Sequence, residues 1–213
     1  GDYNCDTPFK LINETFNWIS KNHKDIDYIF YTGDTASHQH FSQSYYKNLD
    51  AIFEISNLFD YYFLNTPVYN ILGNHDTWPI DQFPNYPYNQ GWLTSILPHW
   101  NKYFTDDSNK TFSYGGYYSK LLDKNLRLIA INSLYYDSYN FLSYSNVYDY
   151  VEQLNWLEDT LEKSKINNEK VWLIGHIYPL ATESKETFTI NFNNLVKKYY
   201  DIILFQIWGH LHN

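Results

Sequence analysis

Methionine is absent from the sequence and cysteine occurs once, and both scarcities limit what the chain can be. A primary translation product begins with Met, whereas this chain begins with Gly1, so we expect a processed chain or a fragment that is cut at both ends. A single cysteine excludes a zinc site built from several thiolates within the chain. Two alternatives stay open for Cys5: a buried free thiol, or one half of a disulfide whose partner lies outside this chain.

Positive charge and long apolar runs are also scarce. The chain has 15 Lys and Arg against 24 Asp and Glu, which gives a net charge of −9. This balance argues against binding to a nucleic-acid duplex through a basic surface. No apolar run approaches the roughly 18 residues that a membrane-spanning helix needs, so the sequence predicts no transmembrane segment. The hydrophobic share of 44% and charged share of 18% exclude a disordered chain.

Two acceptor triplets for N-glycosylation are present, Asn13-Glu14-Thr15 and Asn109-Lys110-Thr111. They predict glycans on Asn13 and Asn109, and they fit a secreted or lysosomal protein.

Helical and strand-like patterns alternate along the chain, which predicts an α/β fold with a sheet covered on both faces. Thr7 and Pro8 form a typical helix start, with the Thr7 hydroxyl as the cap and Pro8 at the first helical position. No repeat or linker divides the chain, so we expect one domain over residues 1–213. The expected strands are 28–32, 68–72, 126–132, 171–174 and 202–208, and the expected helices are 8–22, 44–64, 92–100, 151–163 and 190–199.

Four of the expected strands end at a glycine that is followed at once by a residue able to bind a metal ion. Because ligands of α/β sheets bind beyond the carboxyl ends of the strands, these junctions predict one common site. Asp, Asn and His donors suit zinc, manganese or iron rather than thiolate-seeking metals. The junctions read Gly33-Asp34-Thr35-Ala36-Ser37-His38, Gly73-Asn74-His75-Asp76, Gly175-His176 and Gly209-His210-Leu211-His212.

The alternative is that these residues only pack or face solvent. A single Gly-Asp or Gly-His is common, and a single histidine is usually a packing or surface residue. All four junctions in this order, each after an apolar run, make coincidence improbable.

The four junctions resemble the motif blocks of the calcineurin-like metallophosphoesterase superfamily: Gly-Asp, Gly-Asn-His-Asp/Glu, Gly-His and a closing Gly-His-x-His. The chain is more narrowly similar to the acid sphingomyelinase-like phosphodiesterases, and the similarity covers essentially its whole length. The residues that carry this narrower similarity are Gly-Asp-x-x-x-His at 33–38, Trp78-Pro79 after the second block, Cys5-Asp6-Thr7-Pro8, Gly115-Gly116-Tyr117-Tyr118-Ser119 and Asn132.

The resemblance implies a layered α-β-β-α sandwich, here only partly covered. The family's first block, an Asp-x-His, is absent from this sequence, and the family's catalytic domain continues beyond the last block. We therefore expect residues 1–213 to be a fragment of the catalytic domain that lacks the first block and the C-terminal strands.

The resemblance also implies a centre of two divalent metal ions, with zinc expected on this donor set, and a hydroxide bridged between them that attacks phosphorus. Asp34 would bridge the ions, and Asn74, His176 and His210 would complete one site. His212 would serve the other ion, together with the missing Asp and His.

The leaving oxygen then needs a proton, for which His75 is the first candidate and His38 the second. Asp76 would either orient His75 or cap the following turn, and these alternatives stay open. Surface or packing roles are expected for His23, His40 and His99, and core packing rather than a substrate cleft for Trp78, Tyr135 and Tyr136.

The predicted function is hydrolysis of a phosphodiester. The expected substrate is a lipid or another small molecule, with the phosphodiester in a lipid headgroup or in a nucleotide-type compound. Two alternatives remain: a phosphomonoesterase of the same superfamily, or a noncatalytic relative that acts as a binding protein. Every ligand position that this chain covers is intact, which weighs against the noncatalytic alternative.

Overall fold

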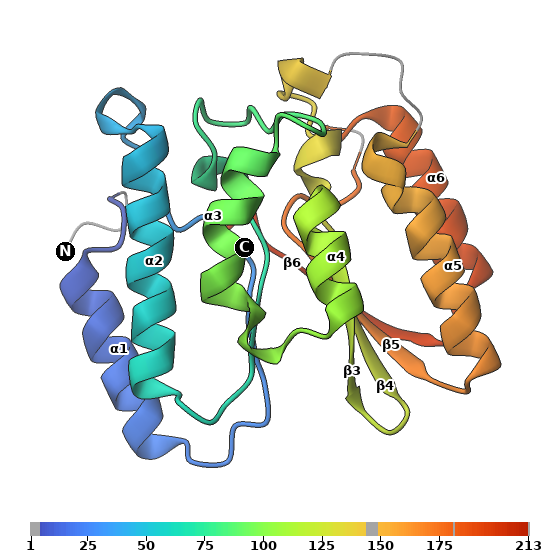
Figure 1. The fold of residues 1–213 in the computed structure, drawn as a ribbon, viewed down its shortest axis with the longest axis horizontal. Helices are drawn as coiled ribbons and strands as arrows, with labels where there is room; N and C mark the ends of the chain where they lie inside the picture. Colours follow the sequence, from blue (N-terminus) through green and yellow to red (C-terminus); the bar gives the residue numbers. More distant parts are fainter. Residues whose placement is uncertain (1–4, 144–148, 181, 213) are drawn as a thin grey trace.

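The structure, a computed structural model, describes residues 5–143, 149–180 and 182–212. Two sheets lie between two pairs of helices (Figure 1). Helices α1 (Phe9–Asn22) and α2 (Tyr45–Tyr62) lie on one side, and α5 (Gln153–Ile166) and α6 (Glu186–Lys198) lie on the other. The predicted α/β class and its α-β-β-α layers are confirmed.

The first sheet pairs β1 (Ile29–Tyr31) with β2 (Val68–Asn70) in parallel. Successive side chains of a strand point to opposite faces, and β1 separates two cores in this way. Tyr31 packs against Phe59 of α2, with ring centroids 5.5 Å apart. Phe30, on the opposite face, meets Trp172 of the second sheet at 5.8 Å. The two sheets are therefore held together by aromatic rings, which explains part of the aromatic richness of the chain.

The second sheet has the order β3-β4-β5-β6. Strand β3 (Tyr118–Asp123) is antiparallel to β4 (Leu126–Ala130), whereas β5 (Lys170–Gly175) and β6 (Ile203–Trp208) continue parallel to β4. On the outer face, Phe192 of α6 packs edge-on against Trp208 at 5.6 Å. Parallel strands bring their carboxyl ends to one edge, so the ends of β5 and β6 emerge together.

Two further helices cover the junction between the sheets, α3 (Gln90–Trp100) and α4 (Asp106–Gly115). Trp92 of α3 contacts Tyr45 of α2 at 4.4 Å, and Trp100 contacts Phe112 of α4 at 5.7 Å. Neither α4 nor strand β3 was predicted from the sequence. Thr105 caps α4 by accepting a hydrogen bond from the Ser108 amide, a start signal hidden in a polar stretch.

Most expected elements are found within a few residues of their expected bounds, but the start of α1 is a correction. Pro8 is the capping residue rather than the first helical residue, and no side chain caps this helix. The Pro8 carbonyl accepts from the Leu11 amide at 2.8 Å. Extended backbone at Pro8, with φ −69° and ψ 143°, starts the helix at Phe9 and leaves the Thr7 hydroxyl outside it. Helix α6 begins at Glu186, four residues before its expected start.

No helix among the described residues is both long and apolar enough to cross a bilayer.

Candidate metal centre

The loops after β1 and β2 touch each other at two glycines. A Cβ on Gly33, whose φ is +89°, would lie 2.3 Å from the Gly73 nitrogen, and a Cβ on Gly73 would lie 2.2 Å from Asp34 Oδ1. Neither position can hold a larger residue without displacing main chain or the Asp34 carboxylate. The glycines of the first two junctions therefore serve close approach, which brings Asp34 beside the 73–76 turn.

Asp76 fastens the two loops together. Its Oδ2 accepts from the amides of Gly73 at 2.8 Å and Asp34 at 3.0 Å, and its Oδ1 accepts from the Thr35 amide at 2.7 Å. The main chain of Asp34 lies in the left-handed region at φ +60°. The three hydrogen bonds to the Asp76 carboxylate, called the Asp76 clamp below, stabilise this conformation. These bonds go to the turn that Asp76 closes and to the loop after β1, so neither role considered for Asp76, orienting His75 or capping the following turn, describes what the structure shows.

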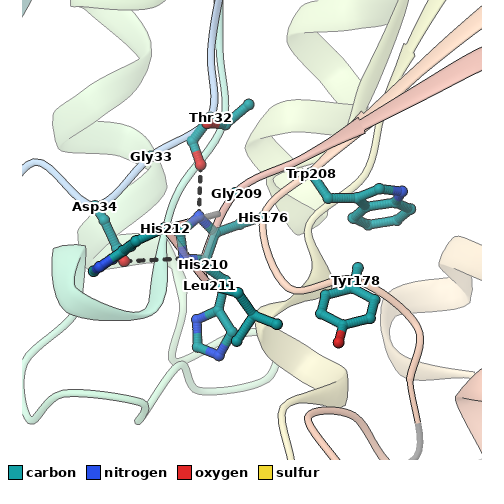
Figure 2. Close-up of a pocket in the computed structure, with 10 residues that line it drawn as sticks. All are labelled: Thr32, Gly33, Asp34, His176, Tyr178, Trp208, Gly209, His210, Leu211 and His212. Carbon is teal, nitrogen blue, oxygen red and sulfur yellow. Dashed lines mark hydrogen bonds and ion pairs between the residues drawn. The ribbon is translucent and has the colours of Figure 1, made fainter.

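Four predicted ligands meet at one point at the carboxyl ends of β1, β2, β5 and β6. Asn74 Oδ1 lies 2.9 Å from His176 Nε2 and 3.0 Å from His210 Nδ1. Asp34 Oδ2 lies 3.1 Å from His176 Nε2, a contact drawn in Figure 2. Among the described residues, Asp34, His176 and His210 form a group whose ligand atoms all lie within 4.8 Å of one another.

A second layer of contacts orients this ligand group, defined here as Asp34, Asn74, His176 and His210. His176 Nδ1 is 2.6 Å from the carbonyl oxygen of Thr32, so Nδ1 carries the hydrogen and Nε2 faces the group. The Asn74 amide nitrogen donates to Asp81 Oδ1 at 2.7 Å, which turns its oxygen inward. His210 Nε2 lies 3.3 Å from Glu183 Oε2. The sequence analysis identified neither Asp81 nor Glu183.

The charges of the ligand group are coupled. Burial acts to raise the pKa of Asp34, but the hydrogen bond and charge of His176 hold it below its usual value. Burial acts in the opposite sense on His176, whose pKa is nevertheless raised by its hydrogen bond to Asp34 and by the charge of that carboxylate. Both shifts favour the charged form of each partner, which strengthens the contact between Asp34 Oδ2 and His176 Nε2. A divalent cation competes for the same lone pairs.

The residues present fit such an ion. Tetrahedral bonds of about 2.0–2.2 Å around one zinc ion place its ligand atoms roughly 3.3–3.6 Å apart, which is close to the 2.9–3.1 Å of three contacts among these side chains. Imidazole nitrogens with carboxylate and amide oxygens are also the donor types that divalent zinc and its neighbours accept.

The remaining predicted site residues form a histidine cluster, defined here as His38, His40, His75 and His212, beside the ligand group. The ring of His38 lies 4.1 Å from that of His75 and 5.5 Å from that of His212, centroid to centroid. His40, expected to be a packing or surface residue, has its ring 5.7 Å from His75. His212 is therefore close to His38 and outside the group of Asp34, His176 and His210.

Asp6 holds His38 at two points, another contact that the sequence analysis did not foresee. Its Oδ1 lies 2.6 Å from His38 Nδ1, and its Oδ2 accepts from the His38 amide at 3.0 Å. His75 is fixed instead through its main chain, because its amide donates to Asp34 Oδ1 at 2.9 Å. Its Nδ1 is buried without a hydrogen-bond partner among the described residues. Burial also lowers the pKa of His75 below its usual value.

An open cavity of about 500 Å³ adjoins the ligand group (Figure 2). Asp34, His176, His210 and His212 line it on one side, and Tyr178, Trp208 and Leu211 add an apolar wall. A cavity with convergent polar groups beside an apolar wall is typical of a small-molecule site.

Other expected roles have mixed outcomes. Tyr135 and Tyr136 are buried core residues as predicted, whereas Trp78 is 38% exposed, so the expectation of core packing is wrong there. It follows the buried 73–77 turn directly, at the edge of the folded core. His99 packs on Phe53 with ring centroids 4.0 Å apart, as expected.

The remaining candidates for modification lie on or near helices. Cys5 is exposed, which overturns the alternative of a buried thiol, because it precedes α1 and enters neither core. Its disulfide stays a prediction.

Asn13 lies in α1, where its Oδ1 accepts from the Tyr62 hydroxyl at 2.9 Å, and Asn109 lies in α4. Glycosylation of both residues also stays a prediction.

Comparison with known proteins places this site in context. The chain is 34% identical over 220 residues to a sphingomyelinase phosphodiesterase C of Dictyostelium discoideum, covering 100% of this chain and 48% of the relative. It is 30% identical over 226 residues to the human cyclic GMP-AMP phosphodiesterase SMPDL3A, covering 100% of this chain and 48% of the relative. A sphingomyelin phosphodiesterase 2 of Caenorhabditis elegans is 31% identical over 218 residues, with coverage of 99% and 35%. The chain thus spans about half, or less, of the length of these relatives.

The sequence profile of the calcineurin-like phosphoesterases matches residues 2–213. That match covers every junction from Gly33 to His212, and the ligand atoms of the four junctions converge as described above. The chain belongs to the calcineurin-like phosphoesterase family.

Proposed function

We propose that the protein containing this chain is a metal-dependent phosphodiesterase, and that this chain supplies part of its catalytic domain. The observation that carries the proposal is the convergence of Asp34, Asn74, His176 and His210 from four separate strand ends. Three relatives at 30–34% identity are named as phosphodiesterases, of sphingomyelin or of cyclic GMP-AMP, which supports diester hydrolysis. The substrate class is a lipid headgroup or a nucleotide-type phosphodiester.

The ligand group holds one divalent ion in this proposal, and zinc is the ion that its donors favour. Asp34 and His212 contribute to a second ion, together with residues that this chain does not supply. Bound divalent ions activate water and neutralise charge on the phosphoryl oxygens. The chain's own residues fix these positions: Thr32 orients His176, Asp81 orients Asn74, and the Asp76 clamp sets the main chain of Asp34.

Proton transfer to the leaving oxygen belongs to the histidine cluster. His75 is the proposed donor, because the hydrogen bond from its main-chain amide to Asp34 Oδ1 fixes it directly beside the ligand group. His38 is the second candidate, since Asp6 orients its ring and leaves the side chain 49% exposed toward incoming substrate. Leu211, Tyr178 and Trp208 form the apolar wall that would receive the organic part of the substrate.

The proposal includes a secreted or lysosomal location, which the two glycosylation triplets at Asn13 and Asn109 support. A disulfide from the exposed Cys5 to a cysteine outside this chain belongs to the same proposal.

Hydrolysis of bis-p-nitrophenyl phosphate and of p-nitrophenyl phosphate by the full-length protein tests the proposal. We expect turnover of the diester to exceed that of the monoester, to vanish after treatment with a strong chelator and to return with zinc. A preference for the monoester would favour the phosphomonoesterase. Zinc binding with no turnover of either ester would favour the noncatalytic alternative, and chelator-resistant turnover would contradict the metal centre.

A further inference from the structure

The main chain of His210 lies outside the strands, so strand pairing does not set the direction of its ring. It follows Gly209, outside strand β6, and its main chain is in the left-handed region at φ +75°. A residue in this region is not aligned by strand pairing, so the direction of its side chain depends on side-chain contacts. Its Nδ1 faces Asn74 Oδ1 at 3.0 Å, which leaves Nε2 to find a partner elsewhere.

Glu183 supplies that partner from the loop between β5 and α6. Its Oε2 lies 3.3 Å from His210 Nε2, and the two side chains are 23% and 16% exposed. A carboxylate that accepts from one ring nitrogen places the hydrogen on that nitrogen and the lone pair on the other. The contact therefore selects the His210 tautomer whose Nδ1 lone pair points into the ligand group.

The main chain of Glu183 is fixed, unlike that of an ordinary surface glutamate. Its carbonyl oxygen accepts from both the amide and the hydroxyl of Ser138, each at 3.1 Å, and its amide donates to Leu180 at 3.0 Å. The next residue, Ser184, is buried, and its hydroxyl is 2.8 Å from the hydroxyl of Thr189 in α6. The carboxylate is thus presented from an anchored turn.

The neighbouring cation does not neutralise Glu183. Lys185 Nζ is directed away, donating to the carbonyls of Ser143 at 2.6 Å and Tyr135 at 3.2 Å. Among the described residues, His210 Nε2 is the group that the Glu183 carboxylate contacts.

We infer that Glu183 is a positioning residue for the metal centre, which fixes the tautomer and orientation of His210 through its Nε2. This inference rests on the proposed function, because it requires that the ligand group bind a divalent ion. In this role Glu183 acts through His210 and not as a ligand of the ion. Removing such an outer partner typically weakens metal binding about 10–100-fold.

Zinc affinity of the full-length protein, measured by competition with a chromophoric chelator, tests the inference. We expect Glu183→Ala to bind zinc about 10–100-fold more weakly than wild type. Glu183→Gln should recover part of the loss, because its amide oxygen accepts the same hydrogen bond. Glu186→Gln, an exposed carboxylate three residues away at the start of α6, is the matched control and should leave affinity unchanged.

Long-range nitrogen–proton NMR correlations of the metal-free protein give a second readout, independent of activity and of zinc. We expect the hydrogen of His210 on Nε2 in wild type and Glu183→Gln, and distributed over both nitrogens in Glu183→Ala. Wild-type zinc affinity in Glu183→Ala, or an unchanged tautomer, would overturn the inference while leaving the metal centre intact. A wild-type protein that binds no zinc would overturn the proposed metal centre and this inference with it.

Discussion

The two halves of the candidate site are built in different ways. In the ligand group, the side chains of His176 and Asp34 are 1% and 12% exposed, and three outer contacts hold its rings and amide. In the histidine cluster, His38 is 49% exposed and is held by Asp6, whereas the histidines meet one another ring against ring. Fixed, buried donors suit the binding of an ion. A cluster in which the buried His75 adjoins the half-exposed His38 suits the delivery of a proton to substrate.

The largest effect is expected where the ligand group is broken. Asp34→Asn removes a charged ligand and leaves His176 without its ion pair, so activity should fall to background on both diesters and p-nitrophenyl esters. The metal content, measured by elemental analysis, should drop in parallel. Retained zinc with full activity would show that Asp34 is not part of the centre.

A smaller effect, which depends on the substrate, is expected in the histidine cluster. His75→Ala should lower turnover of diesters with poor leaving groups about 10²–10⁴-fold, the usual contribution of a general acid. Much of this loss should disappear on a p-nitrophenyl ester, whose leaving group needs little protonation. Metal content should stay at the wild-type level.

His38→Ala separates the two candidate donors. We expect a smaller loss that is similar on both types of substrate, as for a residue that assists binding. If His38→Ala shows the dependence on leaving group and His75→Ala does not, then His38, oriented by Asp6, is the acid.

The buried carboxyl group of Asp137 predicts a dependence of stability on pH. Burial raises the pKa of Asp137 to about 7, and its Oδ2 has no hydrogen-bond partner among the described residues. The folded state binds the proton of the Asp137 carboxyl group more tightly than the unfolded state does. Protonated Asp137 therefore contributes to the free energy of unfolding at pH 4, and this contribution is lost as the pH rises to 7. The loss has an upper value of roughly 4 kcal/mol at about 1.4 kcal/mol per pKa unit.

Asp137→Asn should therefore flatten this part of the profile, because an amide carries no charge at any pH. Urea unfolding at pH 5 and pH 8 measures the effect. An equal drop in the free energy of unfolding for wild type and variant would assign the pH dependence to other groups.

The smallest effect is expected at His40, at the rim of the histidine cluster. Its ring meets that of His75 edge-on at 5.7 Å, a type of contact worth about 0.5–1.5 kcal/mol. His40→Ala should lower turnover by roughly tenfold at most, equally for good and poor leaving groups. A loss confined to poor leaving groups would extend proton transfer to His40 and weaken the contrast between the two halves.

The sequence was sufficient to predict the α/β class and the four junctions that the structure brings together, because both follow from local signals, whereas the family resemblance selected the four proposed ligands among the junction residues. Each ligand stands next to the glycine that ends an apolar strand, so its place at the sheet edge can be predicted from adjacent residues. The outer partners could not be predicted in this way. Asp6 reaches His38 across 32 residues and Glu183 reaches His210 across 27, and both lie in loops with no strand or helix pattern.

The errors have similar causes. The Thr7-Pro8 pair carries a start signal, but the extended conformation of Pro8 moves the start of α1 to Phe9. Helix α4 was missed because Asp106–Gly115 contains few apolar residues, with Phe112 as its fully buried anchor. Trp78 is exposed although Trp side chains are usually well buried, and composition alone cannot identify such an exception.

Anomalous X-ray diffraction at the zinc edge, from crystals of the full-length protein, tests the central claim most directly. The account predicts a peak at bonding distance, about 2.0–2.2 Å, from Asp34 Oδ2, Asn74 Oδ1, His176 Nε2 and His210 Nδ1. Zinc-loaded crystals with no peak among these four atoms, or with the peak elsewhere in the protein, would contradict it.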